Sequence, residues 1–268
     1  HARRLRLPRV VARSDAESER TATAVAGNVE AIFATLAREL LPGFVQQPER
    51  IKLQVVAYRS RASYAALMRE MPEYEWSAGF YSPAGLIAFH LEQPSDEAAT
   101  ALLLHEAAHA FLDRYVVRRG VALPRWFGEG LAQYVGNSEV RDGRLVPGQK
   151  ARGRYELWRG QHVRVDSEAS LEAAQLQRAL RKGEGPGVAR LLGATPETFY
   201  GAGRELYYGS AWLFVHYLRH GAPDWATTRF PQLVLYLAEG YPDDVAVRQL
   251  YGDPDALEAA FRAYAKSF

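Results

Sequence analysis

The sequence predicts an α+β fold in which a small mixed sheet, with helices on one side, is followed by a mainly helical C-terminal part. Short apolar segments at 51–58 and 86–90 are typical of strands, and segments with helical periodicity lie around them. Beyond residue 171, apolar residues recur at helical spacing. We therefore expect an irregular basic arm at 1–20, a subdomain with the sheet at 21–135, and a mainly helical subdomain at 136–268 that completes the cleft.

Local patterns define the elements of the sheet-containing subdomain. The segment 23–41 predicts an amphipathic helix, because five apolar residues share one face: Val29, Ile32, Phe33, Leu36 and Leu40. A strand at 51–58 and a helix at 60–71 follow, and residues 79–83 predict a turn or the first arm of a hairpin. The strand at 86–90 then leads into the next helix.

The C-terminal subdomain begins with a polar, glycine-rich stretch at 136–170 that contains one short predicted strand at 144–146. Helices are expected after it at 171–181, 187–192, 196–199, 207–220, 231–238, 243–251 and 254–266. The sequence contains no internal repeat and no low-complexity tract.

The segment 95–119 predicts one long helix that is buried on most sides. Ser95 is a suitable N-cap, and two acidic residues follow it in the first turn. Arg118, Arg119 and Gly120 are typical of a helix end.

Inside this helix, the pentapeptide His105-Glu106-Ala-Ala-His109 places two imidazoles one turn apart on the same face. Two imidazoles in this arrangement can bind one zinc ion. Glu106 is offset around the helix, so it is expected to reach a water molecule on the metal and act as general base. The pattern therefore predicts metal-assisted hydrolysis; the alternative is a helix whose polar residues are hydrogen-bonded internally.

Zinc in a hydrolase usually takes a third protein ligand beside a water molecule. Leu112 and Tyr115 stand where a metzincin has glycine and histidine, so that class is excluded. His90 and His162 remain possible ligands, but neither has a signature around it.

Glu129 is the strongest candidate for the third ligand. It lies in a second predicted helix, for which Pro124 is a suitable start. The flanking Gly128 and Gly130 indicate close approach of other backbone, although they also weaken the helix. The alternative interpretation of Glu129 is an ordinary solvated carboxylate.

The two motifs together resemble those of the gluzincin metallopeptidases. The HExxH pentapeptide is followed by Pro-Arg-Trp-Phe-Gly-Glu-Gly-Leu-Ala-Gln-Tyr, which is similar to the W-[LF]-x-E-G-x-A-x-Y motif of the poorly characterised bacterial peptidase-MA-like proteins. The resemblance extends from about residue 51 to the C-terminus. It implies a zincin-like fold around the subdomain 21–135, Zn²⁺ as cofactor, Glu129 as third zinc ligand, and an extracytoplasmic peptidase.

One position departs from the pattern. Thermolysin-like members carry an aspartate four residues after the glutamate ligand, where it supports a zinc histidine, and this chain has Gln133 there. Asp113, one turn beyond His109, is either a substitute that orients an imidazole or an ordinary surface carboxylate.

Two further expectations concern the substrate. Similar family members carry a Y-x-x-S pattern at a helix start, which falls on Tyr207 and Ser210 and implies that the Tyr207 phenol stabilises an oxyanion. Tyr208 takes that role if the register shifts by one residue. The alternative is that the tyrosine only packs the start of the helix. In zincins the strand before the active helix is often a sheet edge that pairs with an extended peptide, which implies this role for 86–90.

Composition limits the partners. The chain of 268 residues has a formal net charge of +2, which gives no reason to expect nucleic acid as a partner, and the basic arm with Arg3, Arg4, Arg6 and Arg9 is interpreted as a solvated tail. No apolar run has the length of a membrane span. Cysteine is absent, which excludes disulfides, thiolate ligands and a cysteine nucleophile.

The sequence therefore predicts a zinc-dependent peptidase that acts on a peptide or protein substrate, with His105, His109 and Glu129 as ligands and Glu106 as general base. The first alternative is an inactive or gated relative whose groove binds a peptide or cell-wall partner. The second is a helical interaction protein with a coincidental HExxH.

Overall fold

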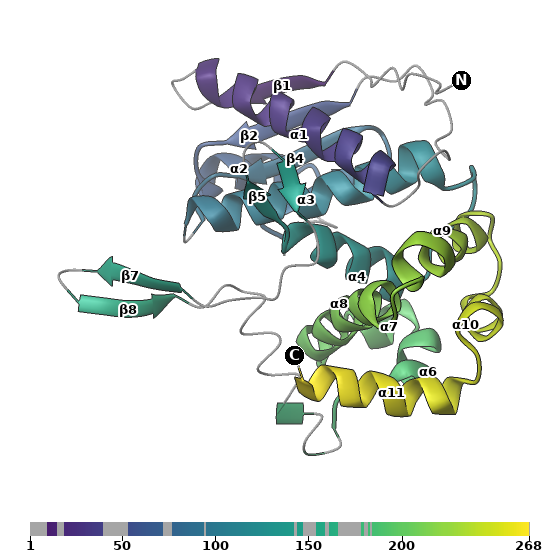
Figure 1. The fold of residues 1–268 in the computed structure, drawn as a ribbon. Coiled ribbons are helices and arrows are strands. Elements are labelled where there is room, and N and C mark those ends of the chain that lie inside the picture. Colours follow the sequence, from purple (N-terminus) through teal and green to yellow (C-terminus); the bar gives the residue numbers. More distant parts are fainter. Residues whose placement is uncertain are drawn as a thin grey trace. The chain divides into compact units, whose positions relative to one another are not determined.

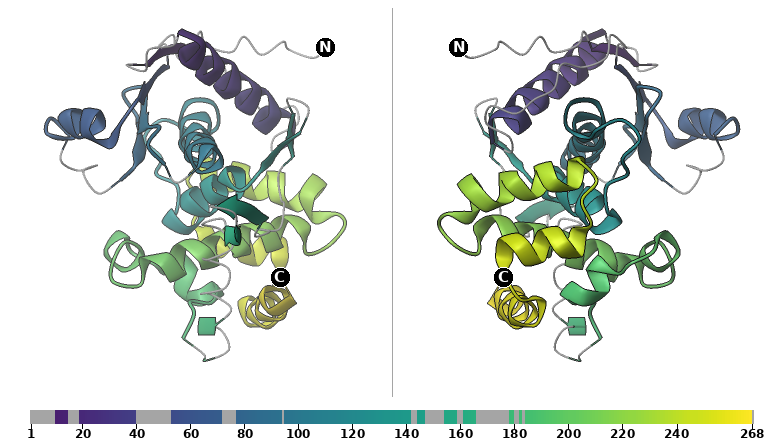
Figure 2. Two further views of the ribbon diagram at one scale, coloured as in Figure 1. Left: turned by 90° about the vertical axis from the view of Figure 1, so that its left-hand side faces the viewer. Right: turned by 90° about the vertical axis from the view of Figure 1, so that its right-hand side faces the viewer.

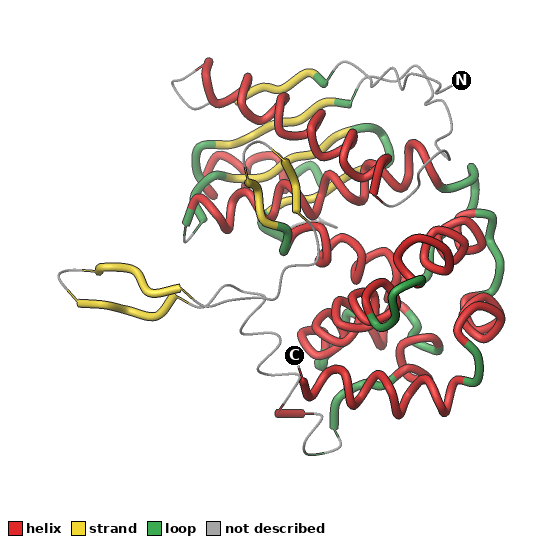
Figure 3. Tube along the Cα trace, in the orientation of Figure 1, coloured by secondary structure: helices red, strands yellow, loops and turns green. Residues whose placement is uncertain are grey.

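The computed structural model describes residues 10–14, 19–39, 53–71, 77–93, 95–141, 144–146, 154–158, 161–165, 178–179, 182 and 184–267. The fold is α+β, with helices and a small mixed sheet of four strands, as the sequence predicts (Figures 1 and 3). The chain divides into two compact units. Unit 1 comprises His1–Val117 and Ser138–Val146, and unit 2 comprises Arg118–Asn137 and Pro147–Phe268.

The sheet of unit 1 has the strand order β1-β2-β4-β3. Strands β1 (Val11–Ser14), β2 (Gln54–Tyr58) and β4 (Leu86–His90) are parallel, and β3 (Gly79–Ser82) runs antiparallel to β4. The strand at 86–90 and the hairpin arm at 79–83 are thus confirmed. The strand at 51–58 is confirmed for 54–58, and residues 51 and 52 lie outside the described residues. Strand β1 falls in the range where the sequence predicts an irregular arm, so that prediction is wrong for these four residues.

Two further expectations about the sheet are wrong. Strand β4 is not an edge, because it pairs with β2 on one side and with β3 on the other; the edge strands are β1 and β3. Helices also cover both faces of the sheet, not one. Helices α1 (Glu19–Glu39) and α3 (Asp96–Phe111) lie on one face, and α2 (Arg61–Met68) lies on the other (Figure 2).

The alternation of side chains along β3 and β4 explains this arrangement, since both faces of these strands are apolar. Phe80 and Ala88 pack against Tyr64 and Met68 of α2. On the opposite face, a Cβ at Gly79 would meet a side-chain atom of α3 at 3.2 Å. Unit 1 is therefore a sheet between two helical layers, and α3 is held directly against β3 and β4.

Helix α3 begins as the sequence predicts and ends earlier. The Ser95 side chain caps it and accepts a hydrogen bond from the Ala98 N–H at 3.2 Å. The helix then widens into the π-helical turn η2 (Leu112–Val116), and Val117 takes an extended backbone with ψ of 132°. The predicted end at residue 119 is wrong, because Gly120, with φ of +83°, belongs to the turn that follows.

An aromatic cluster fixes the end of this helix on α1. Phe33 of α1 makes edge contacts with Phe111 and Tyr115, at ring-centroid distances of 5.7 and 5.5 Å. The last element of unit 1 is the hairpin of β5 (Glu139–Arg141) and β6 (Arg144–Val146), which confirms the short strand at 144–146 and gives it a partner that the sequence did not predict.

Unit 2 is built around the buried helix α8 (Arg204–His220), on which α4 (Arg125–Gly136) packs. The other helical elements are α6 (Val188–Leu192), α7 (Pro196–Phe199), η3 (Trp225–Arg229), α9 (Phe230–Ala238), α10 (Asp243–Tyr251) and α11 (Pro254–Ser267). Strands β7 (Arg154–Trp158) and β8 (Gln161–Val165) form a hairpin in the stretch for which no strand was expected.

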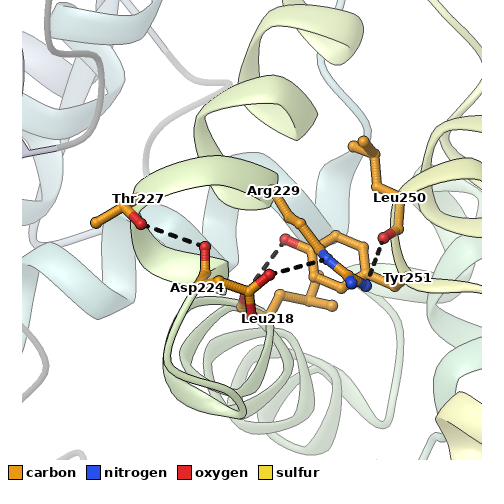
Figure 4. A network of polar contacts seen from close by, with 6 residues as sticks. All are labelled: Leu218, Asp224, Thr227, Arg229, Leu250 and Tyr251. Atoms are coloured by element: carbon orange, nitrogen blue, oxygen red, sulfur yellow. Dashed lines mark hydrogen bonds and ion pairs between the residues drawn. The ribbon is translucent and has the colours of Figure 1, made fainter.

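The predicted helices of the C-terminal part are confirmed, except that α8 begins about one turn earlier and most of 171–181 lies outside the described residues. A polar network joins the end of α8 to α10 (Figure 4). Arg229 donates to the Leu250 carbonyl at 2.9 Å and pairs with Asp224, while the Tyr251 hydroxyl donates to the Leu218 carbonyl at 3.1 Å. Across the described part of the chain, no helix has the length and apolar character of a membrane span.

Candidate metal centre

The two histidines of the pentapeptide lie together on α3. Their Nε2 atoms are 3.1 Å apart and their rings meet edge to face, with centroids 4.8 Å apart. Both side chains are half-buried. The same ring nitrogen of each imidazole thus faces the other, which is the orientation that two nitrogen ligands of one ion require.

The helix around them is buried, as the sequence predicts. Leu103, Leu104, Ala107, Ala108 and Phe111 are all at most 4% exposed. Small alanines beside the histidines let α3 lie close to its neighbours, while Phe111 anchors the helix on α1. The imidazoles are therefore carried by a rigid element and not by a loop.

Glu106 lies on the same helix and is 6% exposed. A carboxylate at this depth is costly without polar partners, so its burial is a feature that packing alone does not explain. It lies near Tyr64 of α2: burial, together with the negative charge of Glu106, raises the pKa of the Tyr64 phenol to about 12, while a hydrogen bond with Ser77 opposes the rise.

Glu129 lies on α4 in unit 2, and its side chain is half-buried. The Tyr200 hydroxyl donates a hydrogen bond to Glu129 Oε1 at 2.8 Å. Burial and the adjacent carboxylate raise the pKa of Tyr200 above its ordinary value, so the phenol keeps its proton and remains a donor. Glu129 is thus not the freely solvated carboxylate of the alternative interpretation.

The two glycines that flank Glu129 differ in their surroundings. A Cβ at Gly130 would lie 2.5 Å from the Ala211 carbonyl oxygen of α8, so the expectation of close backbone approach is confirmed there. A Cβ at Gly128 would meet nothing within 4 Å, so close approach does not explain that glycine. The buried side of α4 is formed by Trp126, Phe127, Leu131 and Tyr134.

The two tyrosines considered for an oxyanion both lie on α8 in unit 2. Tyr207 is buried, with its ring 5.6 Å from Phe199, and Tyr208 is half-buried, with its ring 5.2 Å from the same residue. Ser210 donates to the Pro186 carbonyl at 3.0 Å, which gives the serine of the pattern a structural contact. A catalytic role of Tyr207 stays a prediction.

Two of the remaining candidates, His90 and Asp113, make hydrogen bonds with other residues. His90 is 5% exposed, packs on Tyr64 at 5.5 Å and lies within hydrogen-bond distance of the Gln93 amide, in agreement with a structural histidine. The Asp113 carboxylate is exposed and accepts a hydrogen bond from the Tyr81 hydroxyl at 2.6 Å. The side chain of His162 lies outside the described residues.

Sequence reasoning missed Tyr200 and Tyr81, because their partners are distant in the chain. Tyr200 lies 71 positions from Glu129, and Tyr81 lies 32 positions from Asp113. Neither tyrosine stands in a recognised motif, and the chain has 15 tyrosines. No sequence signal separates these two from the rest.

In comparisons with known proteins, no family model matches the chain and no curated protein matches it. The chemistry of the site is therefore argued from the side chains themselves.

Proposed function

We propose that the protein is a zinc-dependent peptidase of gluzincin type with a zincin-like fold. The observation that carries the proposal is the pair of Nε2 atoms 3.1 Å apart on a buried helix, with the buried Glu106 between the two histidines in sequence. Two imidazole nitrogens and a carboxylate oxygen from Glu129 form the donor set that catalytic zinc sites use.

The spacing of the donors fits one small cation. Two nitrogen ligands about 2.1 Å from a tetrahedral zinc ion lie about 3.4 Å apart, close to the separation of the two imidazole nitrogens. In this proposal Glu129, which belongs to unit 2, supplies the third ligand of the ion that the two imidazoles of unit 1 bind. A bound zinc ion would supply Lewis-acid activation of a water molecule and of the scissile carbonyl.

The chain's own residues perform the remaining steps in this proposal. Glu106 accepts the proton of the attacking water and then delivers it to the leaving amine. Tyr207 donates a hydrogen bond to the developing oxyanion. In this proposal an extended peptide pairs with the outer side of β3, one of the two edge strands of the described sheet, which would give affinity that tolerates many sequences.

Metal content and cleavage of a peptide library, measured together, test the proposal. The protein purified with zinc present should hold about one equivalent. The His105→Ala and His109→Ala variants should lose it, and Glu129→Ala, which keeps both imidazoles, should bind it more weakly. Glu106→Gln should keep the metal and lose cleavage. Glu30→Gln is the matched control, because Glu30 is an exposed carboxylate on α1.

Two outcomes contradict the proposal in different ways. A zinc content near zero would favour a helical protein with a coincidental HExxH. Full zinc content with no cleavage of peptides or denatured proteins by the parent chain would favour the gated or inactive relative, for which Gln133 in place of an aspartate is the motivating residue.

A further inference from the structure

We propose that Tyr200 is a positioning residue for Glu129: its hydroxyl holds one carboxylate oxygen so that the other is presented to a divalent cation. The inference rests on the proposed function, because it assigns a role to Tyr200 only if Glu129 binds a metal. It adds a residue that neither HExxH nor the downstream glutamate motif contains.

The contact itself is specific. Tyr200 Oη donates to Glu129 Oε1 at 2.8 Å, a normal length for a hydrogen bond to a carboxylate. Both residues belong to unit 2, in which α4 and α7 are in contact. The hydrogen bond to Oε1 restricts rotation of the carboxylate, and in this proposal Oε2 is the oxygen that binds the metal.

The tyrosine ring is held on several sides. Phe199 makes an edge contact with it at 5.4 Å, and the Tyr208 ring lies 6.3 Å away. The guanidinium of Arg125, one helical turn before Glu129 on α4, lies 5.8 Å from the ring centroid. These contacts restrict the movement of the ring, which is what a residue that positions the Glu129 carboxylate requires.

This arrangement should raise metal affinity by pre-orienting a ligand. Hydrogen-bond partners of metal ligands typically contribute about 10- to 100-fold in affinity when tested by mutation. Tyr200→Phe removes only the hydroxyl and leaves the ring in its contacts. We therefore expect zinc to bind about 10- to 100-fold more weakly to this variant.

The experiment measures zinc affinity by competition with a chromogenic chelator, on the full chain. Tyr241→Phe is the control, because Tyr241 is 53% exposed on the loop before α10 and should bind zinc as the parent does. The same substitution in a Glu129→Ala background should change affinity little, since the hydroxyl then has no carboxylate to orient. A purely structural role of Tyr200 would lower affinity equally in both backgrounds.

The outcomes separate this inference from the proposed function. Zinc binding by the parent with unchanged affinity in Tyr200→Phe would overturn the positioning role alone. A parent chain that binds no zinc would overturn both. Thermal unfolding of Tyr200→Phe guards against loss of the fold.

Discussion

Replacement of Gly130 by alanine should separate α4 from α8 and destabilise unit 2. The new Cβ would lie 2.5 Å from the Ala211 carbonyl oxygen and 2.7 Å from its carbon, whereas ordinary contact begins at 3.4 Å. The obstacle is backbone, so the helices would have to move apart by about 0.9 Å, the difference between 3.4 and 2.5 Å. Overpacking of this kind typically costs about 1–3 kcal/mol, and here the upper end applies.

The helix propensity of alanine offsets about 1 kcal/mol of that cost, which leaves a net loss of about 2 kcal/mol. For a chain of this size, a loss of that magnitude lowers Tm by about 4–8 °C. Gly128→Ala is the matched control on the other side of Glu129: with nothing within 4 Å of its Cβ, it should gain up to about 1 kcal/mol. Urea unfolding followed by circular dichroism measures both. Equal stability of the two variants would refute the reasoning.

Three further predictions concern stability. Ser95→Ala removes the N-cap of α3 and should cost about 1 kcal/mol in urea unfolding, whereas an unchanged midpoint would show that the cap contributes nothing. Trp126→Phe removes the indole N–H that donates to Asp243 at 2.7 Å and should lower the free energy of unfolding by about 2 kcal/mol. An unchanged free energy of unfolding would show that water replaces this donor. Burial, with nearby positive charge, lowers the pKa of His220 to about 4. Histidine in the unfolded chain has a pKa near 6.5, so below that pH the unfolded state binds a proton that the folded state does not. The free energy of unfolding should therefore be at its full value above about pH 6.5 and fall as the pH drops toward 4. His220 is exposed, so solvent screening should reduce the loss to about 1 kcal/mol, and His220→Gln should remove that part of the pH dependence measured by thermal unfolding.

The elements with strong local patterns were predictable from the sequence. Helix α3 has a capping serine, an acidic first turn and apolar residues all around, and its start was placed correctly at Ser95. The elements that were missed have weak patterns. Strand β1 has only four residues and lies beside a basic arm. Strands β7 and β8 have only five residues each and lie in the polar, glycine-rich stretch at 136–170. A π-helical turn such as η2 has no sequence signal that separates it from an α-helix.

The arrangement of helices about the sheet was harder to predict, because periodicity defines the face of an element and not its partner. Helix α2 has an apolar face whether it packs on the same side of the sheet as α3 or on the opposite side. Its position opposite α3 follows from the second apolar face of β3 and β4, where Phe80 and Ala88 lie. A sequence in which both alternating sets of a strand are apolar predicts a sheet covered on both sides, and that observation was available for 86–90.

In the candidate site too, the contacts within one helix could be predicted from the sequence, whereas the contacts between residues far apart in the chain could not. The orientation of His105 toward His109 follows from helix geometry alone, because residues four apart share a face, and their Nε2 atoms do meet. The hydrogen bond from Tyr200 to Glu129 depends on how α7 packs against α4, and no periodicity describes that contact. The residues that would perform chemistry can thus be found from spacing, whereas the residues that would orient them are defined by packing. For this reason Tyr200→Phe, and not a further substitution within the motifs, is the change that tests whether Glu129 is held in place to bind a metal.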